Sequence, residues 1–216
     1  SSEGGKEMQE ELFNKIVDMD EEGAISLAKE YLDGGGDPQK LLEVCRNAMG
    51  VIGDRFEKGE YFLSELILGG EIFSSIMEFT LPHIKEGETE KLGKIVLGTV
   101  KDDIHNIGKD IFKAFAEAAG FEVIDIGVDV PEEEFVNKVK EHNPDIIGMS
   151  CLITAGISSM KKTVEAIKAA GITDAKIIIG GGRVDEEVKQ LAGADAWADD
   201  AAKGVRLCKE LVGVKE

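Results

Sequence analysis

From residue 94 to its end, the chain alternates short apolar runs rich in β-branched residues with stretches of helical periodicity, and no other feature constrains its fold more. The predicted strands cover residues 94–100, 121–126, 145–150, 176–179 and 194–198. The predicted helices cover residues 109–119, 132–141, 156–170, 185–191 and 201–212. Strands that alternate with helices in this way form a parallel sheet covered on both faces. We therefore predict a doubly wound, flavodoxin-like sheet of five parallel strands.

The N-terminal part follows a different pattern, because apolar side chains recur there at helical spacing throughout. Asp37 and Pro38 supply a helix N-cap and a proline at the first helical position. Four helices with short connections predict a small antiparallel bundle. A polar run at residues 86–91 predicts a linker. We accordingly expect a helical domain over residues 1–87 and an α/β domain over residues 92–216.

The charge of the chain disfavours two classes of partner. With 25 basic and 43 acidic side chains, the formal charge is −18, which repels the phosphates of nucleic acids and anionic lipid headgroups. No apolar run approaches the roughly 20 residues of a membrane span, and the first residues lack the basic and apolar segments of a signal peptide. Three scattered cysteines form no CxxC pair. We expect a cytoplasmic protein that binds neither nucleic acid nor membrane.

The loop after the first predicted strand contains a histidine, His105, with a carboxylate two residues before it, Asp103. Ligands of open α/β sheets bind at the carboxyl ends of the strands, where the strand order switches. A metal-bound histidine donates its second ring N–H to such a carboxylate. With no other His or Cys nearby in sequence, a zinc site is poorly supported, whereas a single ligand suits a metal held in a macrocycle. Taken alone, the pattern D-x-H-x-x-G is more often a surface histidine at a helix start.

Two further elements end the third and fourth predicted strands. Ser150-Cys151-Leu152 ends the third, and Gly180–Gly182 ends the fourth. Small residues at neighbouring strand ends leave room for a long, flat ligand, although each element alone is explained by a helix cap or a tight turn. The spacing of the three elements indicates that they act together: 41 residues separate Gly108 from Ser150, and 28 separate Leu152 from Gly181.

Together these elements resemble the motif D-x-H-x-x-G, S-x-L, G-G of the cobalamin-binding domains of methionine synthase, base-off mutases and corrinoid methyl-carrier proteins. The run GDRFEKGEYFL, at residues 53–63, resembles the helical cap that precedes this domain in methionine synthase and in carrier proteins, and that mutase small subunits lack. The resemblance covers nearly the whole chain, from about residue 10 to the end. The chain looks like a stand-alone corrinoid protein of the methanol, methylamine or aryl-methyl-ether methyltransferase systems.

The resemblance implies that the dimethylbenzimidazole tail of the cofactor leaves the cobalt and enters the α/β domain, and that His105, hydrogen-bonded to Asp103, becomes the lower metal ligand. It implies further cofactor contacts from Asp102, Ile104, Asn106, Gly108, Ser150, Leu152, Thr154, Gly180, Gly181 and Gly182. The helical cap would cover the upper face of the corrin. Four apolar residues are candidates for that cover, although a plain bundle core explains them equally well: Met49, Phe62, Leu63 and Leu66.

The function implied is transport of a methyl group on cobalt. The group would pass from a substrate:corrinoid methyltransferase to a second methyltransferase that acts on tetrahydrofolate or a thiol, and a reductive activase would be a third partner. The chain would be a non-catalytic carrier subunit rather than an enzyme on its own. Three positions depart from the family: Asp102 and Asn106 replace a common Gly and Asp, and Gly156 replaces the Ser that extends the His–Asp pair in methionine synthase, so a three-member relay is doubtful.

Three other classes share parts of this pattern. A phosphorylation receiver domain requires an Asp at the end of the third strand, where Met149-Ser150-Cys151 stands. A flavodoxin-type electron carrier requires a Ser/Thr-rich phosphate loop after the first strand, and the sequence has none there. A cobalamin-dependent sensor shares the cap and the motif, but such sensors usually carry a DNA-binding module, and the negative charge disfavours DNA. The sensor is the alternative that stays open.

Overall fold

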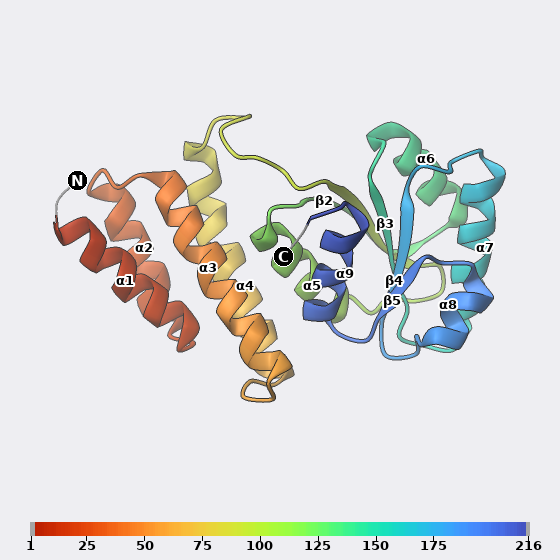
Figure 1. Ribbon diagram of the computed structural model, residues 1–216, viewed down its shortest axis with the longest axis horizontal. Helices are drawn as coiled ribbons and strands as arrows, with labels where there is room; N and C mark the ends of the chain where they lie inside the picture. The colour runs from red at the N-terminus through yellow and green to blue at the C-terminus, as the bar shows by residue number, and fades with distance from the viewer. Residues whose placement is uncertain (1–2, 215–216) are drawn as a thin grey trace. The chain divides into compact units, whose positions relative to one another are not determined.

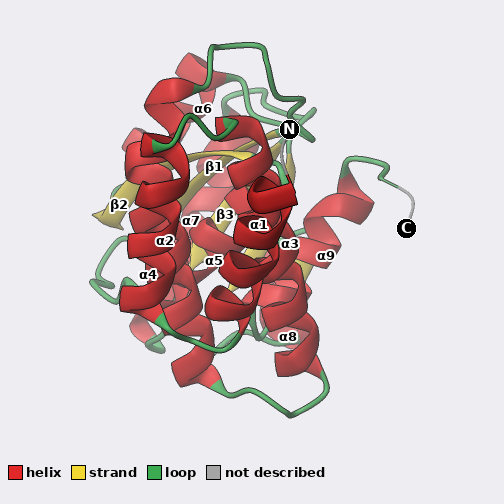
Figure 2. Cartoon of the chain, turned by 90° about the vertical axis from the view of Figure 1, so that its left-hand side faces the viewer, coloured by secondary structure: helices red, strands yellow, loops and turns green. Residues whose placement is uncertain are grey.

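A computed structural model describes residues 3–214, and the chain divides between Glu90 and Lys91 into two compact units. Strands occur only in the second unit among the described residues (Figure 2). The division falls within the stretch predicted as a linker, and the predicted domain ranges, 1–87 and 92–216, stay predictions. No helix of the described part combines the length and the apolar character that a membrane crossing requires.

The first unit is an all-helical bundle. Its helices are α1 (Glu3–Val17), α2 (Glu21–Asp33), α3 (Pro38–Glu57) and α4 (Leu63–Thr80), and a short 3₁₀ turn, η1 (Leu81–His83), follows them. Helix α1 packs on α2 and α3, and α3 packs on α4. The predicted cap is confirmed, because the Asp37 side chain accepts a hydrogen bond from the Gln39 N–H and Pro38 is the first helical residue. The bundle core is fully buried and includes Leu12, Ile16, Leu41, Ile52, Ile72 and Ile76.

The second unit is a five-stranded parallel sheet in the order β2-β1-β3-β4-β5. Its strands are β1 (Lys94–Val100), β2 (Glu122–Val130), β3 (Ile146–Ser150), β4 (Lys176–Gly180) and β5 (Ala196–Ala198). Its helices are α5 (Ile107–Ala119), α6 (Glu132–His142), α7 (Ala155–Ala169), α8 (Glu186–Ala192) and α9 (Ala201–Leu211). The predicted flavodoxin-like sheet is confirmed.

Helices cover both faces of this sheet. Helices α5 and α9 pack together on one face, and α6, α7 and α8 pack on the other (Figure 1). Strands β1 and β3 are almost entirely buried between these layers. The chain crosses to β2 on one side of β1 and then to β3 on the other, so the switch in strand order lies at the carboxyl ends of β1 and β3. Both loops that the sequence singles out begin there.

Candidate functional site

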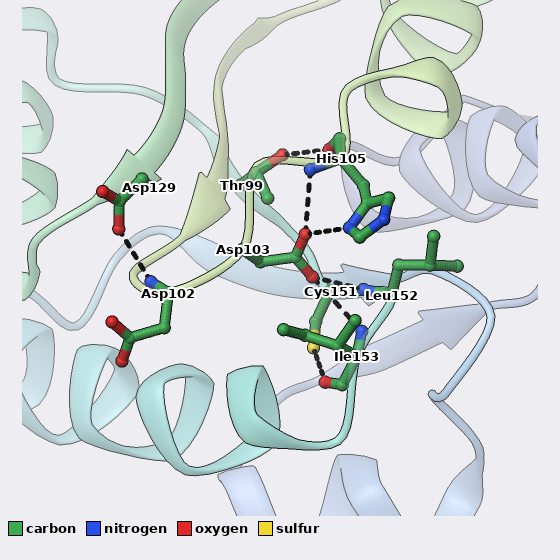
Figure 3. Close-up of polar contacts among 8 residues, drawn as sticks. All are labelled: Thr99, Asp102, Asp103, His105, Asp129, Cys151, Leu152 and Ile153. Carbon is green, nitrogen blue, oxygen red and sulfur yellow. Dashed lines mark hydrogen bonds and ion pairs between the residues drawn. The ribbon is translucent and has the colours of Figure 1, made fainter.

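The loop between β1 and α5 holds the buried carboxylate of the site. Asp103 lies in this loop, and its side chain is completely buried. The residue before it, Asp102, has a φ of 70°, a left-handed conformation that few residues other than glycine adopt. This turn directs the Asp103 side chain inward, beneath the loop and toward the end of β3 (Figure 3).

The Asp103 carboxylate accepts four hydrogen bonds from N–H groups. Its Oδ1 accepts from the backbone N–H of His105 at 2.9 Å and contacts His105 Nδ1 at 2.8 Å. Its Oδ2 accepts from the backbone N–H groups of Leu152 at 2.6 Å and Ile153 at 3.3 Å. One carboxylate therefore joins the loop after β1 to the loop after β3, which are about 50 residues apart in sequence.

This arrangement sets the tautomer of His105. An ionised carboxylate can only accept hydrogen bonds, so Nδ1 must carry the proton and donate it to Asp103. In the neutral ring the lone pair then lies on Nε2, and the His105 side chain is 49% exposed. Thr99, at the end of β1, also restrains the position of His105, because its hydroxyl donates to the His105 carbonyl at 3.1 Å. A neutral, oriented imidazole with a free Nε2 is the form in which histidine binds metals.

The charge of Asp103 is consistent with this role. Burial raises the pKa of the carboxyl group, but hydrogen bonds from the backbone of His105 and Leu152, the His105 ring and the backbone of Ile153 outweigh it, so that the pKa is lowered. Asp103 is therefore ionised at neutral pH although it is buried. In metal sites, such a bond from a histidine Nδ1 to a carboxylate makes Nε2 a more basic ligand.

The loop after β3 is held mainly by backbone contacts. The Cys151 thiol donates to the Ile153 carbonyl at 2.9 Å, and its backbone N–H donates to the Gly180 carbonyl at 2.9 Å. Burial, followed by the charge of Asp103, raises the pKa of this thiol to about 11, so it stays protonated. Gly181 has a φ of 119°, and a Cβ there would lie 1.9 Å from the Cys151 carbonyl oxygen. Only glycine fits at position 181.

No side chain of α7 extends the Asp103–His105 pair in the described part of the chain. Asp103 Oδ2 is bonded to the two backbone N–H groups described above, not to a side chain of α7. At Gly156 a Cβ would lie 2.5 Å from Cys151 Sγ, so the thiol occupies the space that a larger residue would need. Backbone amides therefore complete the network.

The remaining predicted contact residues of the α/β unit lie around this network. Ile104 and Leu152 are exposed by 72% and 43%, and Ile107, at the start of α5, is exposed by 60%. Asn106 and Thr154 stand at the N-cap positions of α5 and α7, and neither side chain makes a capping bond. The other predicted residues continue the same edge of the sheet: Gly108, at the start of α5, Ser150, at the end of β3, and Gly180 and Gly182, at the end of β4.

The four predicted cap residues differ in exposure. Met49 and Leu66 are each 1% exposed and belong to the core of the helical bundle. Phe62 and Leu63, at the start of α4, are 66% and 57% exposed. Only the second pair therefore presents apolar side chains to the surface of the helical unit, and burial favours the core role for the first pair.

Sequence reasoning did not identify three residues that support the loop. One is Thr99. Another is Asp129, at the end of β2, whose carboxylate accepts from the Asp102 N–H at 2.8 Å. The third is Lys109, which is buried in the first turn of α5 and pairs with Asp125 of β2 at 2.6 Å. The position of Asp129, an acidic residue at the carboxyl end of a strand next to β1, was the sequence feature that could have predicted its contact with the loop.

The donor set fits a metal that brings its other ligands with it. Within residues 3–214, no group of three or more His, Cys, Asp or Glu side chains could hold a metal ion. His105 instead offers one nitrogen, and the exposed apolar side chains of Ile104, Ile107 and Leu152 belong to the same loops or directly follow them. A corrin ring supplies four ligands to its cobalt, and its carbon framework and methyl groups are apolar, so these residues fit it.

Comparison with known proteins matches each unit to a family described as B12 binding domain. Residues 93–206 match the B12 binding domain, and residues 8–80 match a second family that is also described as B12 binding domain. The trimethylamine corrinoid protein 1 of Methanosarcina acetivorans is 40% identical over 190 residues, which are 86% of this chain and 88% of that protein.

Two solved structures are similar over most of the chain. A cobalamin-binding protein from Desulfitobacterium hafniense DCB-2 is 41% identical, with a TM-score of 0.72, over 95% of this chain and 98% of that one. A chain of the methanol:cobalamin methyltransferase complex from Methanosarcina barkeri is 23% identical and shows the same fold, with a TM-score of 0.81, over 97% of this chain and 81% of that one.

Proposed function

The chain belongs to the family of B12-binding corrinoid proteins, and we propose that it carries a methyl group on the cobalt of a corrinoid whose lower ligand is His105. The observation that carries the proposal is the pairing of His105 Nδ1 with the buried Asp103 carboxylate at 2.8 Å. Because Nδ1 donates to Asp103, Nε2 is the nitrogen that the neutral ring offers to a metal, on a side chain that is half-exposed. A bound corrinoid would supply a cobalt able to accept and release a methyl group.

The residues of the chain would bind and orient this group. His105 would approach the cobalt from below through Nε2, while Asp103 fixes the ring. Ile104, Ile107 and Leu152 would pack against the apolar ring carbons and methyl groups of the corrin. Close backbone approach at Gly180–Gly182 would admit the tail of the cofactor beside β4. Phe62 and Leu63 are the residues of the helical unit that we propose for the upper face, because their side chains are exposed.

The partners follow from the carrier role. We propose a substrate:corrinoid methyltransferase as donor partner, a second methyltransferase that transfers the group to tetrahydrofolate or a thiol, and a reductive activase. Similar proteins include corrinoid proteins named for trimethylamine and dimethylamine, so methylamine:corrinoid methyltransferases are the donor partners to test first. The chain itself has no catalytic residue in this proposal.

The ligand assignment can be tested with the three histidines of the chain. The protein is reconstituted with hydroxocobalamin and reduced to Co(II), and its electron paramagnetic resonance spectrum is recorded. We expect coupling to one protein nitrogen in the wild type and in His142→Ala, which alters a histidine at the far end of α6. His105→Ala should bind cobalamin without this coupling. Persistence of the coupling in His105→Ala would show that another group is the ligand.

The function is tested separately by methyl transfer. Methylated protein, prepared with a methylamine:corrinoid methyltransferase and its substrate, should lose its methyl group when an acceptor methyltransferase is added. Absorption spectra follow both steps. A chain that binds cobalamin through His105 but accepts no methyl group from methylamine, methanol or methoxylated aromatic systems would be a sensor rather than a carrier.

A further inference from the structure

Two aspartates with left-handed backbones lie next to each other near Asp103. Asp102, in the loop after β1, has a φ of 70°, and Asp129, at the end of β2, has a φ of 50°. Such conformations cost a residue with a side chain about 1–2 kcal/mol, and Asp and Asn tolerate them better than most residues. Both side chains are exposed, so packing of these side chains in the core does not impose the conformation.

Hydrogen bonds between the segments that contain Asp102 and Asp129 stabilise these left-handed conformations instead. The Asp129 carboxylate accepts from the Asp102 N–H at 2.8 Å, and the Asp129 N–H donates to the Asp103 carbonyl at 2.8 Å. Figure 3 shows the first of these bonds, and together the two bonds hold the segment from Asp102 to Asp103 at both ends through one residue of the neighbouring strand. The third contact of the segment, from the Asp103 N–H to the Val100 carbonyl, is longer, at 3.2 Å.

The direction of the Asp103 side chain depends on this segment. A change of φ at Asp102 would swing the next residue away from the end of β3, where its carboxylate accepts two N–H groups. The His105 ring would then lose the acceptor that fixes its tautomer. A glycine at position 102 would adopt the same φ without strain and would not require the bond to Asp129.

We propose that Asp129 is a positioning residue for the cobalt ligand: its carboxylate holds the left-handed turn at Asp102 and, through Asp103, sets the orientation of the His105 ring. This inference rests on the proposed role of His105 as ligand. The bonds of Asp129 described above go to Asp102 and Asp103 and not to the His105 ring, so its expected effect is on the fraction of molecules in which His105 coordinates the metal.

The test uses three changes. Asp129→Gly removes the carboxylate while allowing the φ of 50°. Asp129→Asn, the matched control, keeps an oxygen acceptor and tolerance of that φ but removes the charge. Asp102→Gly removes the strain that the bond offsets, and Asp129→Gly is measured in that background as well as alone.

In the protein without cofactor, the Asp102 amide should exchange with deuterium faster in Asp129→Gly than in the wild type or Asp129→Asn. In the Co(II) form, Asp129→Gly should lower the ratio of nitrogen-coordinated to uncoordinated cobalt about tenfold, the effect of one lost hydrogen bond to a charged group. The same change in the Asp102→Gly background should leave this ratio within about twofold.

Two results would overturn the inference. One is an unchanged coordination ratio in Asp129→Gly. The other is an equal fall of the ratio with and without Asp102→Gly, which would show that Asp129 does not act through that turn. If the wild type itself shows no nitrogen coupling, the ligand role of His105 fails instead, and amide exchange still decides whether Asp129 holds Asp102.

Discussion

Replacing Asp103 by asparagine tests the network at its centre. The carboxylate accepts two N–H groups on each oxygen, from His105 on one side and from Leu152 and Ile153 on the other. An amide has one accepting oxygen and one donating NH₂ group. Whichever way the amide of Asp103→Asn is turned, its NH₂ group faces two donors of the protein.

The cost follows from these lost acceptors. A buried donor without an acceptor costs about 1–3 kcal/mol, and hydrogen bonds to charged groups lie at the upper end. Because the two donors are neighbours and His105 is half-exposed, we expect a loss of about 2–4 kcal/mol rather than the full sum. With a denaturant dependence of about 2 kcal/mol per molar urea, the midpoint should fall by about 1–2 M.

Urea unfolding followed by tryptophan fluorescence measures this loss of stability in the α/β unit, which contains Asp103. Trp197 is the only tryptophan of the chain and lies in β5, where its indole N–H donates to Glu186 at 2.8 Å. Its emission therefore reports unfolding of the sheet and not of the helical bundle. Asp200→Asn is the matched control, since its carboxylate caps α9 through one bond to the Lys203 N–H, which an amide oxygen also accepts.

The effect has a defined pH dependence. The pKa of Asp103 is lowered below its ordinary value of 3.8, so its ionised form stabilises the protein above that pH. This contribution is lost as the pH falls through the lowered pKa. The difference between wild type and Asp103→Asn should be constant near neutral pH and should shrink below about pH 3.8. Equal urea midpoints for Asp103→Asn and Asp200→Asn at pH 7 would refute the account of the network.

Two further predictions concern glycines near this network. Gly181→Ala should destabilise the sheet unit by about 3 kcal/mol or more, because its Cβ would meet a carbonyl oxygen at 1.9 Å and its φ is 119°. Gly180→Ala, whose Cβ would have its nearest atom at 3.5 Å, should cost less than about 1 kcal/mol. Equal urea midpoints for these two variants would contradict the prediction. Gly156→Ser should cost about 1–3 kcal/mol through contact with Cys151, and a double-mutant cycle with Cys151→Ala should recover most of that cost, whereas additive losses would show that the thiol is not the obstacle.

Periodicity predicted the sheet well because buried parallel strands are continuous apolar runs. The first strand was predicted to the residue, and the order of the sheet was predicted from its alternation with helices. The second strand was predicted to end at Ile126 but continues to Val130. Gly127 and Asp129 have positive φ values of 99° and 50°, and such residues usually mark the end of a strand. Because the predicted strand ended before Asp129, the sequence did not indicate that Asp129 contacts the loop after β1.

Within the site, side-chain contacts were more predictable than backbone contacts. The pairing of Asp103 with His105 is local, and their spacing in the motif predicted it. The amides of Leu152 and Ile153 were not predicted, because any residue supplies a backbone N–H and the motif therefore carries no sign of it. Helical spacing also could not separate exposed Phe62 from buried Leu66, because both belong to one apolar pattern.

The Asp103–His105 bond would have a further consequence if, as proposed, His105 binds a metal and releases it. The neutral ring donates from Nδ1 to Asp103, which leaves Nε2 as the nitrogen available to a metal. If the released ring took up a proton on Nε2, Nδ1 would remain a donor, so the bond to Asp103 would persist and become charge-assisted. The ring would then keep its orientation in both states, and loss of the proton alone would restore a ligand already in position. A carboxylate held by backbone amides suits this task, because those donors do not titrate.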